Sequence, residues 1–338
     1  MDSSARPRIY VFGWPSDLGG ADTKLAHLLD LLRDRCELTV IPNEARLLRQ
    51  ANWVRFLAER GIRSALLQQL PPVLEGFALA LGNPFFFSRH IAHEARRRGL
   101  RVIWSSEMTW HHEGELEAVK AGIVDKVLYT SEFQKSFLAP GYGSLESVVT
   151  GNYIDARTFP FCRRANQIFT IGRLSRATAG KYPEDFPVFY ECLDLPQVRF
   201  RVMAWSDALR HKYRWHRFDD RWELLSAGAE TSSAFLSTLD LFVYPLGHKI
   251  KESWGRSTVE AMLTGAIPIV PDGHQFDQFI VEGESGFICS DIQDYRSCCH
   301  RLYQNSSLRN QIASQARRRA IELCDPRSHL DVWMSVFK

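Results

Sequence analysis

The chain has 338 residues, of which 45% are hydrophobic, so it can build two domains of ordinary size with a large core in each. A net charge of +3 is nearly balanced and gives no general reason to expect a nucleic-acid partner. Seven cysteines show neither C-x-x-C pairs nor zinc spacing, the first residues lack a signal-peptide core, and no run of eighteen apolar residues occurs. We therefore expect reduced thiols in a cytoplasmic protein that is soluble or peripheral to a membrane.

The first predicted unit is a strand, a glycine turn and an amphipathic helix. Residues 9–12 are a short apolar run, and Gly19 and Gly20 precede the helix. This order is typical of a Rossmann-like half, in which glycines let the backbone approach a bound group closely. The full G-x-G-x-x-G pattern is absent, so the sequence does not indicate NAD, and a plain tight turn is the alternative.

The segment 44–70 interleaves five arginines with apolar residues that include Trp53 and Phe56. Its basic amphipathic character is compatible with an anionic membrane surface. The alternative is an ordinary pair of surface helices covering a sheet, because helices that face a core show the same apolar stripe.

Further strands of the first half are predicted at 38–41, 77–81, 101–104, 125–129 and 147–150. The polar and aromatic stretch after residue 104 contains His111 and His112, at the carboxyl end of a strand, where open α/β sheets bind ligands. Both histidines are therefore candidate site residues. Adjacent histidines on a loop are equally compatible with satisfied surface positions.

The second half begins with a predicted strand at 168–171 that leads to Arg173 and, through a loop containing glycine, to Lys181. Two fixed cations suit a departing diphosphate, because arginine offers bidentate geometry and lysine a point charge. After the strand at 198–203 comes a segment rich in Trp, Arg and His, which also resembles a stacking surface for nucleic acid. From residue 291 onward the pattern is helical.

Glu252 stands in a turn before a helix that we expect to start near Arg256, and Glu260 lies two turns further on. The free N–H groups and dipole of that helix N-terminus favour an anionic group, while the carboxylates accept hydrogen bonds from hydroxyls on either side. A hydroxyl-rich ligand with an anionic middle describes a nucleotide sugar. The alternative is a solvated Glu252 and a Glu260 paired with a neighbouring base.

The stretch 240–286 contains LFVYP, an E-x7-E motif from Glu252 to Glu260, EAMLTGAIPIV and EGESGF. It resembles the signature of retaining glycosyltransferases of the GT-B fold, family 4. The resemblance implies an α/β protein with two Rossmann-like domains that face each other across a cleft. These would be an acceptor domain (1–155), a nucleotide-sugar domain (156–320) and a C-terminal helix (321–338) that packs back on the first, with the hinge within 152–166.

The resemblance also implies roles for particular residues. Arg173 and Lys181 would stabilise the departing diphosphate, although their spacing is longer than in the commonest form of the motif. Glu252 would hold the transferred sugar, Glu260 the ribose, and His111 or His112 the sugar or the acceptor, while the segment 204–225 would recognise the base. The donor site would include Gly19, Gly20, Ser253, Trp254, Gly255, Arg256, Ser257 and Thr258. Because no suitable D-x-D motif occurs, we expect neither metal nor cofactor.

The predicted function is a retaining hexosyltransferase that uses a UDP or GDP sugar. Its acceptor would be a lipid-linked or envelope-polysaccharide precursor, reached by reversible contact with the anionic inner membrane face. The alternatives are a glycosyltransferase acting on a nucleic-acid base or a soluble small molecule, an epimerase or phosphorylase on the same fold, and a non-catalytic nucleotide-sugar binding protein.

Overall fold

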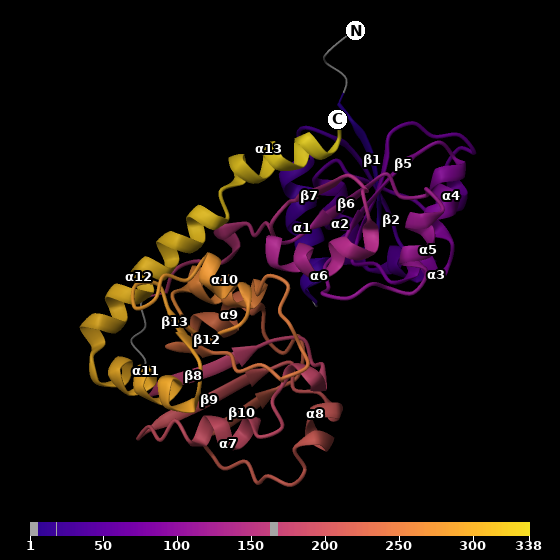
Figure 1. Ribbon diagram of the computed structural model, residues 1–338. Helices are drawn as coiled ribbons and strands as arrows, with labels where there is room; N and C mark the ends of the chain where they lie inside the picture. Colours follow the sequence, from indigo (N-terminus) through magenta and orange to yellow (C-terminus); the bar gives the residue numbers. More distant parts are fainter. Residues whose placement is uncertain (1–5, 18, 163–167) are drawn as a thin grey trace. The chain divides into compact units, whose positions relative to one another are not determined.

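The computed structural model describes residues 6–17, 19–162 and 168–338. The chain divides into two compact units (Figure 1): the first comprises the chain up to Ile154 together with Pro326–Lys338, and the second is Asp155–Asp325. Each unit is built around one parallel sheet.

The sheet of the first unit has the order β3-β2-β1-β4-β5-β6-β7, and all of its described pairings are parallel. Its central strand β4 is buried at every residue, as expected for a parallel strand covered on both faces. The strands are Arg8–Phe12 (β1), Glu37–Ile41 (β2), Arg63–Ser64 (β3), Phe77–Leu81 (β4), Arg101–Ser105 (β5), Lys126–Tyr129 (β6) and Ser147–Val149 (β7).

Helices cover both faces of this sheet and form two separate cores. The core on one face takes residues from α1, α2 and α13, and the core on the other takes residues from α3, α4, α5 and α6. Successive strand residues alternate between the two cores, as the pleat requires. The helices are Gly20–Leu32 (α1), Ala51–Glu59 (α2), Phe85–Ser88 (α3), Ile91–Arg97 (α4), Glu115–Lys120 (α5), Glu132–Tyr142 (α6) and Pro326–Val336 (α13).

The last helix, α13, completes the first unit although it lies at the end of the chain. Trp333 and Val336 are fully buried in the core that α1 also lines. The buried ammonium of Lys126 donates to the Val336 carbonyl at 3.0 Å. The last helix of the chain is thus part of the first unit.

The second unit has a parallel sheet in the order β10-β9-β8-β11-β12-β13. Its strands are Phe169–Leu174 (β8), Val198–Met203 (β9), Trp222–Leu225 (β10), Leu241–Val243 (β11), Ile267–Pro271 (β12) and Phe287–Cys289 (β13). Its helices are Phe186–Glu191 (α7), Asp207–Lys212 (α8), Ser232–Ser237 (α9), Arg256–Thr264 (α10), Ile292–Gln304 (α11) and Ser306–Leu323 (α12).

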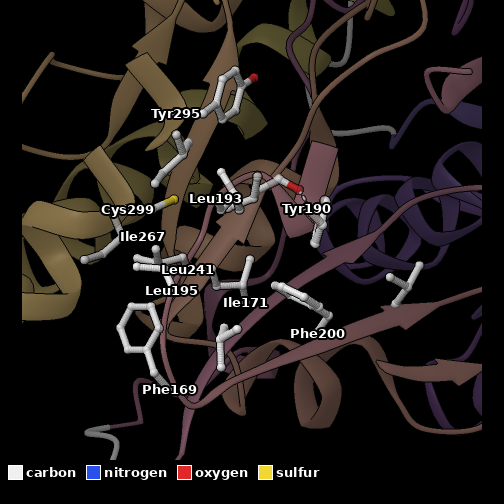
Figure 2. Packing of buried hydrophobic residues seen from close by; sticks show 14 of the residues in the cluster. Phe169, Ile171, Tyr190, Leu193, Leu195, Phe200, Leu241, Ile267, Tyr295 and Cys299 are labelled. Carbon is white, nitrogen blue, oxygen red and sulfur yellow. Dashed lines mark hydrogen bonds between the residues drawn. The ribbon is translucent and has the colours of Figure 1, made fainter. Parts of the chain in front are cut away.

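One large core fills the space between this second sheet and the helices α7, α8, α11 and α12 (Figure 2). Strand residues such as Ile171, Phe200 and Leu241 point into it and meet Tyr190 from α7 and Cys299 from α11. The Tyr190 hydroxyl donates to the Val243 carbonyl at 2.6 Å, so the phenol is satisfied within the core. This packing fixes β8 and β11, whose carboxyl ends carry the site described below.

Two sequence expectations need correction. Segment 44–70 is not a pair of helices: it forms a single α-helix, α2, flanked by 3-10 turns at Ala45–Arg49 and Leu67–Gln69 and by the short strand β3. Trp53 and Phe56 pack against the first unit's core, so the apolar stripe faces inward rather than toward a membrane. No helix among the described residues is long and apolar enough to span a bilayer.

The aromatic segment 204–225, which also resembles a stacking surface for nucleic acid, is the second case. It forms α8 and the edge strand β10. Trp205 and Tyr213 are almost completely buried and stack on each other at 5.6 Å, whereas Trp215 is exposed. Because most of these rings fill the core, the segment does not form the stacking surface that binding of a nucleic-acid strand would need.

Candidate functional site

The candidate site lies at the point where the strand order of the second sheet reverses. Chain order runs from β8 outward to β9 and β10 on one side, and then to β11, β12 and β13 on the other. The crevice at the carboxyl ends of such neighbouring strands is the usual ligand site in open α/β sheets. Arg173 lies at the end of β8, and Tyr244 and Pro245 follow β11 directly.

Arg173 is fully buried at this point and holds two loops together. One of its terminal nitrogens donates to the Lys181 carbonyl at 2.8 Å, and the other donates to the Pro245 carbonyl. Its guanidinium carbon lies 4.0 Å from the centre of the Tyr182 ring and 4.5 Å from that of Tyr244, within cation–π distance of both rings. The cation that the sequence placed at the diphosphate is therefore enclosed by protein here.

Lys181 reaches further out than Arg173 and forms an ion pair with Glu252. Its ammonium lies 2.8 Å from Glu252 Oε2, and the Tyr244 hydroxyl donates to the same oxygen at 2.9 Å. Burial would lower the pKa of Lys181, but the Glu252 carboxylate outweighs it and raises that pKa above its usual value. Burial would likewise raise the pKa of Glu252, and the Lys181 ammonium reverses this and holds it low. Both side chains are charged at neutral pH.

Helix α10 begins at Arg256, four residues after Glu252. Gly255 precedes it in a left-handed conformation with φ of 82°, which glycine adopts without strain. Arg256 and Glu260 form an ion pair at 2.8 Å along the helix, and burial raises the pKa of Glu260, an effect that Arg256 only partly offsets. Glu260 thus has a basic partner, as the alternative interpretation of the sequence expected. The Glu260 side chain is buried.

The remaining predicted donor residues surround the start of α10. Trp254 is nearly buried and packs on the Phe279 ring at 5.7 Å. Ser253 and Ser257 are half-buried, and Thr258 is fully buried in the first turn of the helix. The first-turn N–H groups of a helix have no intrahelical acceptor and therefore suit an anion.

Several buried polar atoms in this part of the second unit, beside Arg173 or around the start of α10, have no hydrogen-bond partner among the described residues. They are the Tyr182 hydroxyl, the Thr258 hydroxyl and both amide atoms of Gln275. Gln275 is only 1% exposed, and its neighbours in the chain contact the turn before α10. Buried polar groups are nearly always paired in a complete protein, so these atoms indicate a place for bound solvent or ligand. Gln275 was not predicted from the sequence, where its burial has no visible signal.

The predicted glycines of the first unit stand at the start of α1. Gly19 precedes the helix with φ of 93°, and its carbonyl accepts from the Thr23 backbone N–H at 3.0 Å. Gly20 is exposed and is the first helical residue. This is the predicted order of strand, turn and helix, and the described residues of the turn specify no ligand.

His111 and His112 have different surroundings. Glu115 is fully buried; its Oε1 lies 3.3 Å from His111 Nδ1, and it also accepts from the Tyr142 hydroxyl and the His112 backbone N–H. His112 packs edge-on against Trp104, and burial lowers its pKa. His111 therefore remains the better candidate for a reactive imidazole, with Glu115 fixing its ring. The four-residue spacing of His111 and Glu115 was the signal in the sequence that could have identified Glu115.

No protein-family model and no curated protein matches the sequence. Solved structures do match. HepE from Anabaena, solved with UDP and glucose, has a TM-score of 0.75 and 15% identity, covering 98% of this chain and 99% of that one. TarM has a TM-score of 0.76 at 11% identity, with both chains covered completely. The chain has the GT-B fold. Sucrose-phosphate synthase from Thermosynechococcus elongatus is also similar, with a TM-score of 0.71, 13% identity and 98% of each chain covered.

These identities are low, so what the structural similarity shows is the fold. HepE, TarM and sucrose-phosphate synthase are GT-B glycosyltransferases, and HepE has also been solved with UDP-glucose. The architecture expected from the sequence, two Rossmann-like domains with parallel sheets, is thereby confirmed.

Proposed function

We propose that the protein is a retaining hexosyltransferase of family 4 that moves a sugar from a nucleotide donor to an acceptor hydroxyl. The observation that carries this proposal is the half-buried Lys181–Glu252 ion pair beside the start of α10, at the reversal point of the second sheet. The Lys181 ammonium and the N-terminus of α10 suit a diphosphate, and the Glu252 carboxylate can accept hydrogen bonds from hydroxyl groups attached to it. The fold supports the proposal because the similar proteins named above are glycosyltransferases.

In this proposal each group has a separate task. The Lys181 ammonium and the first-turn N–H groups of α10 stabilise the negative charge that grows on the departing diphosphate. Glu252 accepts hydrogen bonds from the transferred sugar, and Glu260 from the ribose. The departing phosphate helps to deprotonate the acceptor on the same face of the sugar, which gives retention at the anomeric carbon. The fixed cation takes the place of a metal ion, and no cofactor is used.

We propose UDP as the donor nucleotide, because HepE has been solved with UDP and with UDP-glucose. The direct test is to incubate the protein with UDP- and GDP-sugars and to follow slow hydrolysis of the donor. The configuration of the released sugar, read by proton NMR before mutarotation, distinguishes retention from inversion. Binding of the donor without any turnover would instead favour a non-catalytic nucleotide-sugar binding protein.

The two carboxylates should respond differently to substitution. We expect Glu260→Gln to weaken UDP and the intact UDP-sugar equally, because it acts on the ribose. Glu252→Gln should leave UDP binding nearly unchanged and weaken the UDP-sugar, because it acts on the transferred sugar. Calorimetric titration of both variants with both ligands measures this, and Glu284→Gln, an exposed carboxylate of the same unit, is the control. Equal effects of the two variants on both ligands would contradict the division of roles.

For the acceptor, the first unit offers a cavity of about 310 Å³ at the carboxyl ends of β1 and β2. One wall belongs to the segment 44–70, through Ala45 and residues 66–68. Seven of the nine lining residues are apolar; the lining consists of Phe12, Ile41, Pro42, Asn43, Ala45, Leu66, Leu67, Gln68 and Ile91. We therefore propose that the acceptor is a lipid-linked or envelope-polysaccharide precursor whose apolar part occupies this cavity.

This proposal predicts a preference for acceptors that carry an alkyl chain. An octyl glycoside below its micelle concentration should have a KM at least tenfold lower than the methyl glycoside of the same sugar, because each buried methylene contributes about 0.8 kcal/mol. Ala45→Trp should remove the difference and leave donor hydrolysis unchanged. Val73→Trp, at a residue that is 75% exposed, is the matched control. Equal KM values for the two glycosides would favour a soluble small-molecule acceptor.

A cytoplasmic location with reversible membrane contact remains part of the proposal, but its basis is narrower than the sequence indicated. Besides segment 44–70, the sequence offers Arg96, Arg97 and Arg98 of the same unit for contact with anionic lipid, but Arg96 forms an ion pair with Asp125, and Arg97 and Arg98 with Glu94. In segment 44–70, Arg49 and Arg55 are exposed and would supply the attraction to anionic lipid.

A further inference from the structure

The turn before α10 is tied to the loop after β12 by two hydrogen bonds between consecutive residues. The Lys251 ammonium donates to the Gly273 carbonyl at 3.2 Å. The Glu252 backbone N–H donates to His274 Nδ1, also at 3.2 Å. The second hydrogen bond holds the backbone of Glu252, and the carboxylate of Glu252 pairs with Lys181.

A third contact, between Gly255 and Phe276, follows those of Lys251 with Gly273 and Glu252 with His274. A Cβ atom on Gly255 would lie 2.5 Å from the Phe276 ring, so only a glycine lets the two segments approach this closely. The turn at 251–255 and the loop at 273–276 therefore lie against each other over several residues. The position of Glu252 depends on this contact as well as on its own side-chain partners.

His274 can accept the Glu252 N–H only as a neutral imidazole. A protonated imidazole has a donor on both nitrogens, and Nδ1 would then face the backbone N–H with a hydrogen of its own. The accepting Nδ1 also fixes the tautomer, with the proton on Nε2. Burial lowers the pKa of His274, and Lys251 lowers it further, so the neutral form is favoured at physiological pH.

We propose that His274 is a positioning residue for Glu252: its neutral imidazole accepts the Glu252 backbone N–H and thereby fixes where the carboxylate meets the donor sugar. This inference rests on the proposed function, since it assigns a helper to a residue of the same site. It also gives the site a pH dependence, because protonation of His274 removes the acceptor and turns the hydrogen bond into a repulsive contact.

The direction of the pH effect follows from the charged groups around His274. Lys251 opposes protonation, whereas Glu252 and Asp272 favour it, and burial opposes it most strongly. The pKa of His274 in the folded protein is therefore below its usual 6.5, and the hydrogen bond is present above that pKa and lost as the pH falls through it. Burial would raise the pKa of Glu252, but Lys181 holds it below its usual 4.5, so Glu252 does not account for an acid limb of activity above that value.

The test compares two amide replacements with the wild-type protein. In His274→Asn the side-chain oxygen takes nearly the place of Nδ1 and can accept the same N–H, whereas in His274→Gln the amide stands near the position of Nε2. We expect the Asn variant to keep at least half of the wild-type kcat/KM for donor hydrolysis and to lose the acid limb. The Gln variant should lose about tenfold, mostly through a higher KM for the UDP-sugar, with UDP affinity unchanged.

Thermal unfolding of both variants separates positioning from a general loss of structure, because a purely structural role would lower kcat/KM in step with Tm and leave the acid limb in place. Equal kcat/KM in the Asn and Gln variants, or an acid limb that persists in the Asn variant, would overturn the proposal. A wild-type protein that binds UDP-sugar without hydrolysing or transferring it would refute the proposed function instead, so the two failures are distinguishable.

Discussion

Lys181→Ala should lower kcat for donor hydrolysis and transfer by roughly 100- to 1000-fold, while UDP binding weakens much less. A fixed donor that meets developing charge contributes about 2.7–4 kcal/mol to the transition state, and far less to the ground state. Lys181 is the cation best placed for this task, because it lies outside the aromatic enclosure of Arg173 and its ammonium already faces a carboxylate of the site. Initial rates at saturating donor, together with UDP titrations, measure both quantities.

Lys249→Ala is the matched control, since Lys249 is an exposed lysine of the loop that leads to Glu252. It should turn over at the wild-type rate. A Lys181→Ala variant that also kept the wild-type kcat would show that the leaving group is stabilised elsewhere. A variant that lost UDP binding and kcat to the same degree would indicate a uniform binding role instead.

The order of elements could be predicted from the sequence because parallel strands are short apolar runs. Phe77–Leu81, Val198–Met203 and the start of α10 at Arg256 all stand where the pattern indicated. Segment 44–70 was misjudged because its apolar stripe fits a helix of any length, and the actual chain stops the helix at Glu59 to add β3 to the sheet edge. The pairing of β3 with β2 ends the helix early, and the local sequence pattern contains no information about this pairing.

The candidate site was predictable as a set of residues but not as a set of contacts. The E-x7-E spacing pointed to Glu252 and Glu260, and a basic partner for Glu260, which is Arg256, was among the alternatives, but nothing in the pattern indicates that Glu252 pairs with Lys181. Glu115, Gln275 and His274 were also missed. The importance of Gln275 and His274 comes from burial and from partners on other elements, which no spacing within their own segment reports, whereas the four-residue spacing of His111 and Glu115 was a usable signal.

Arg173→Ala should reduce stability and activity together. The substitution leaves the Pro245 carbonyl without its donor, leaves the Lys181 carbonyl with only the Gly247 backbone N–H at 3.3 Å, and opens a space beside the rings of Tyr182 and Tyr244. An unpaired buried carbonyl costs about 1–3 kcal/mol, and the cavity adds to this, so we expect a loss of about 3–5 kcal/mol in the free energy of unfolding. The kcat should fall as well, because the loop that carries Lys181 loses its anchor.

Arg173→Lys separates the two roles that a buried arginine can have. A lysine keeps the positive charge but cannot donate in a fork to two carbonyls while lying beside two rings. If Arg173 acts by holding the loops, the lysine variant should be destabilised nearly as much as the alanine variant, and its kcat should fall in parallel. If the guanidinium contacts the diphosphate directly, kcat should fall while the unfolding midpoint stays at the wild-type value. Arg176→Ala, an exposed arginine three residues further along the chain, should change neither quantity. Urea unfolding of the four proteins, with kcat measured well below their transition midpoints, therefore decides whether this cation stabilises the leaving group or the protein that surrounds it.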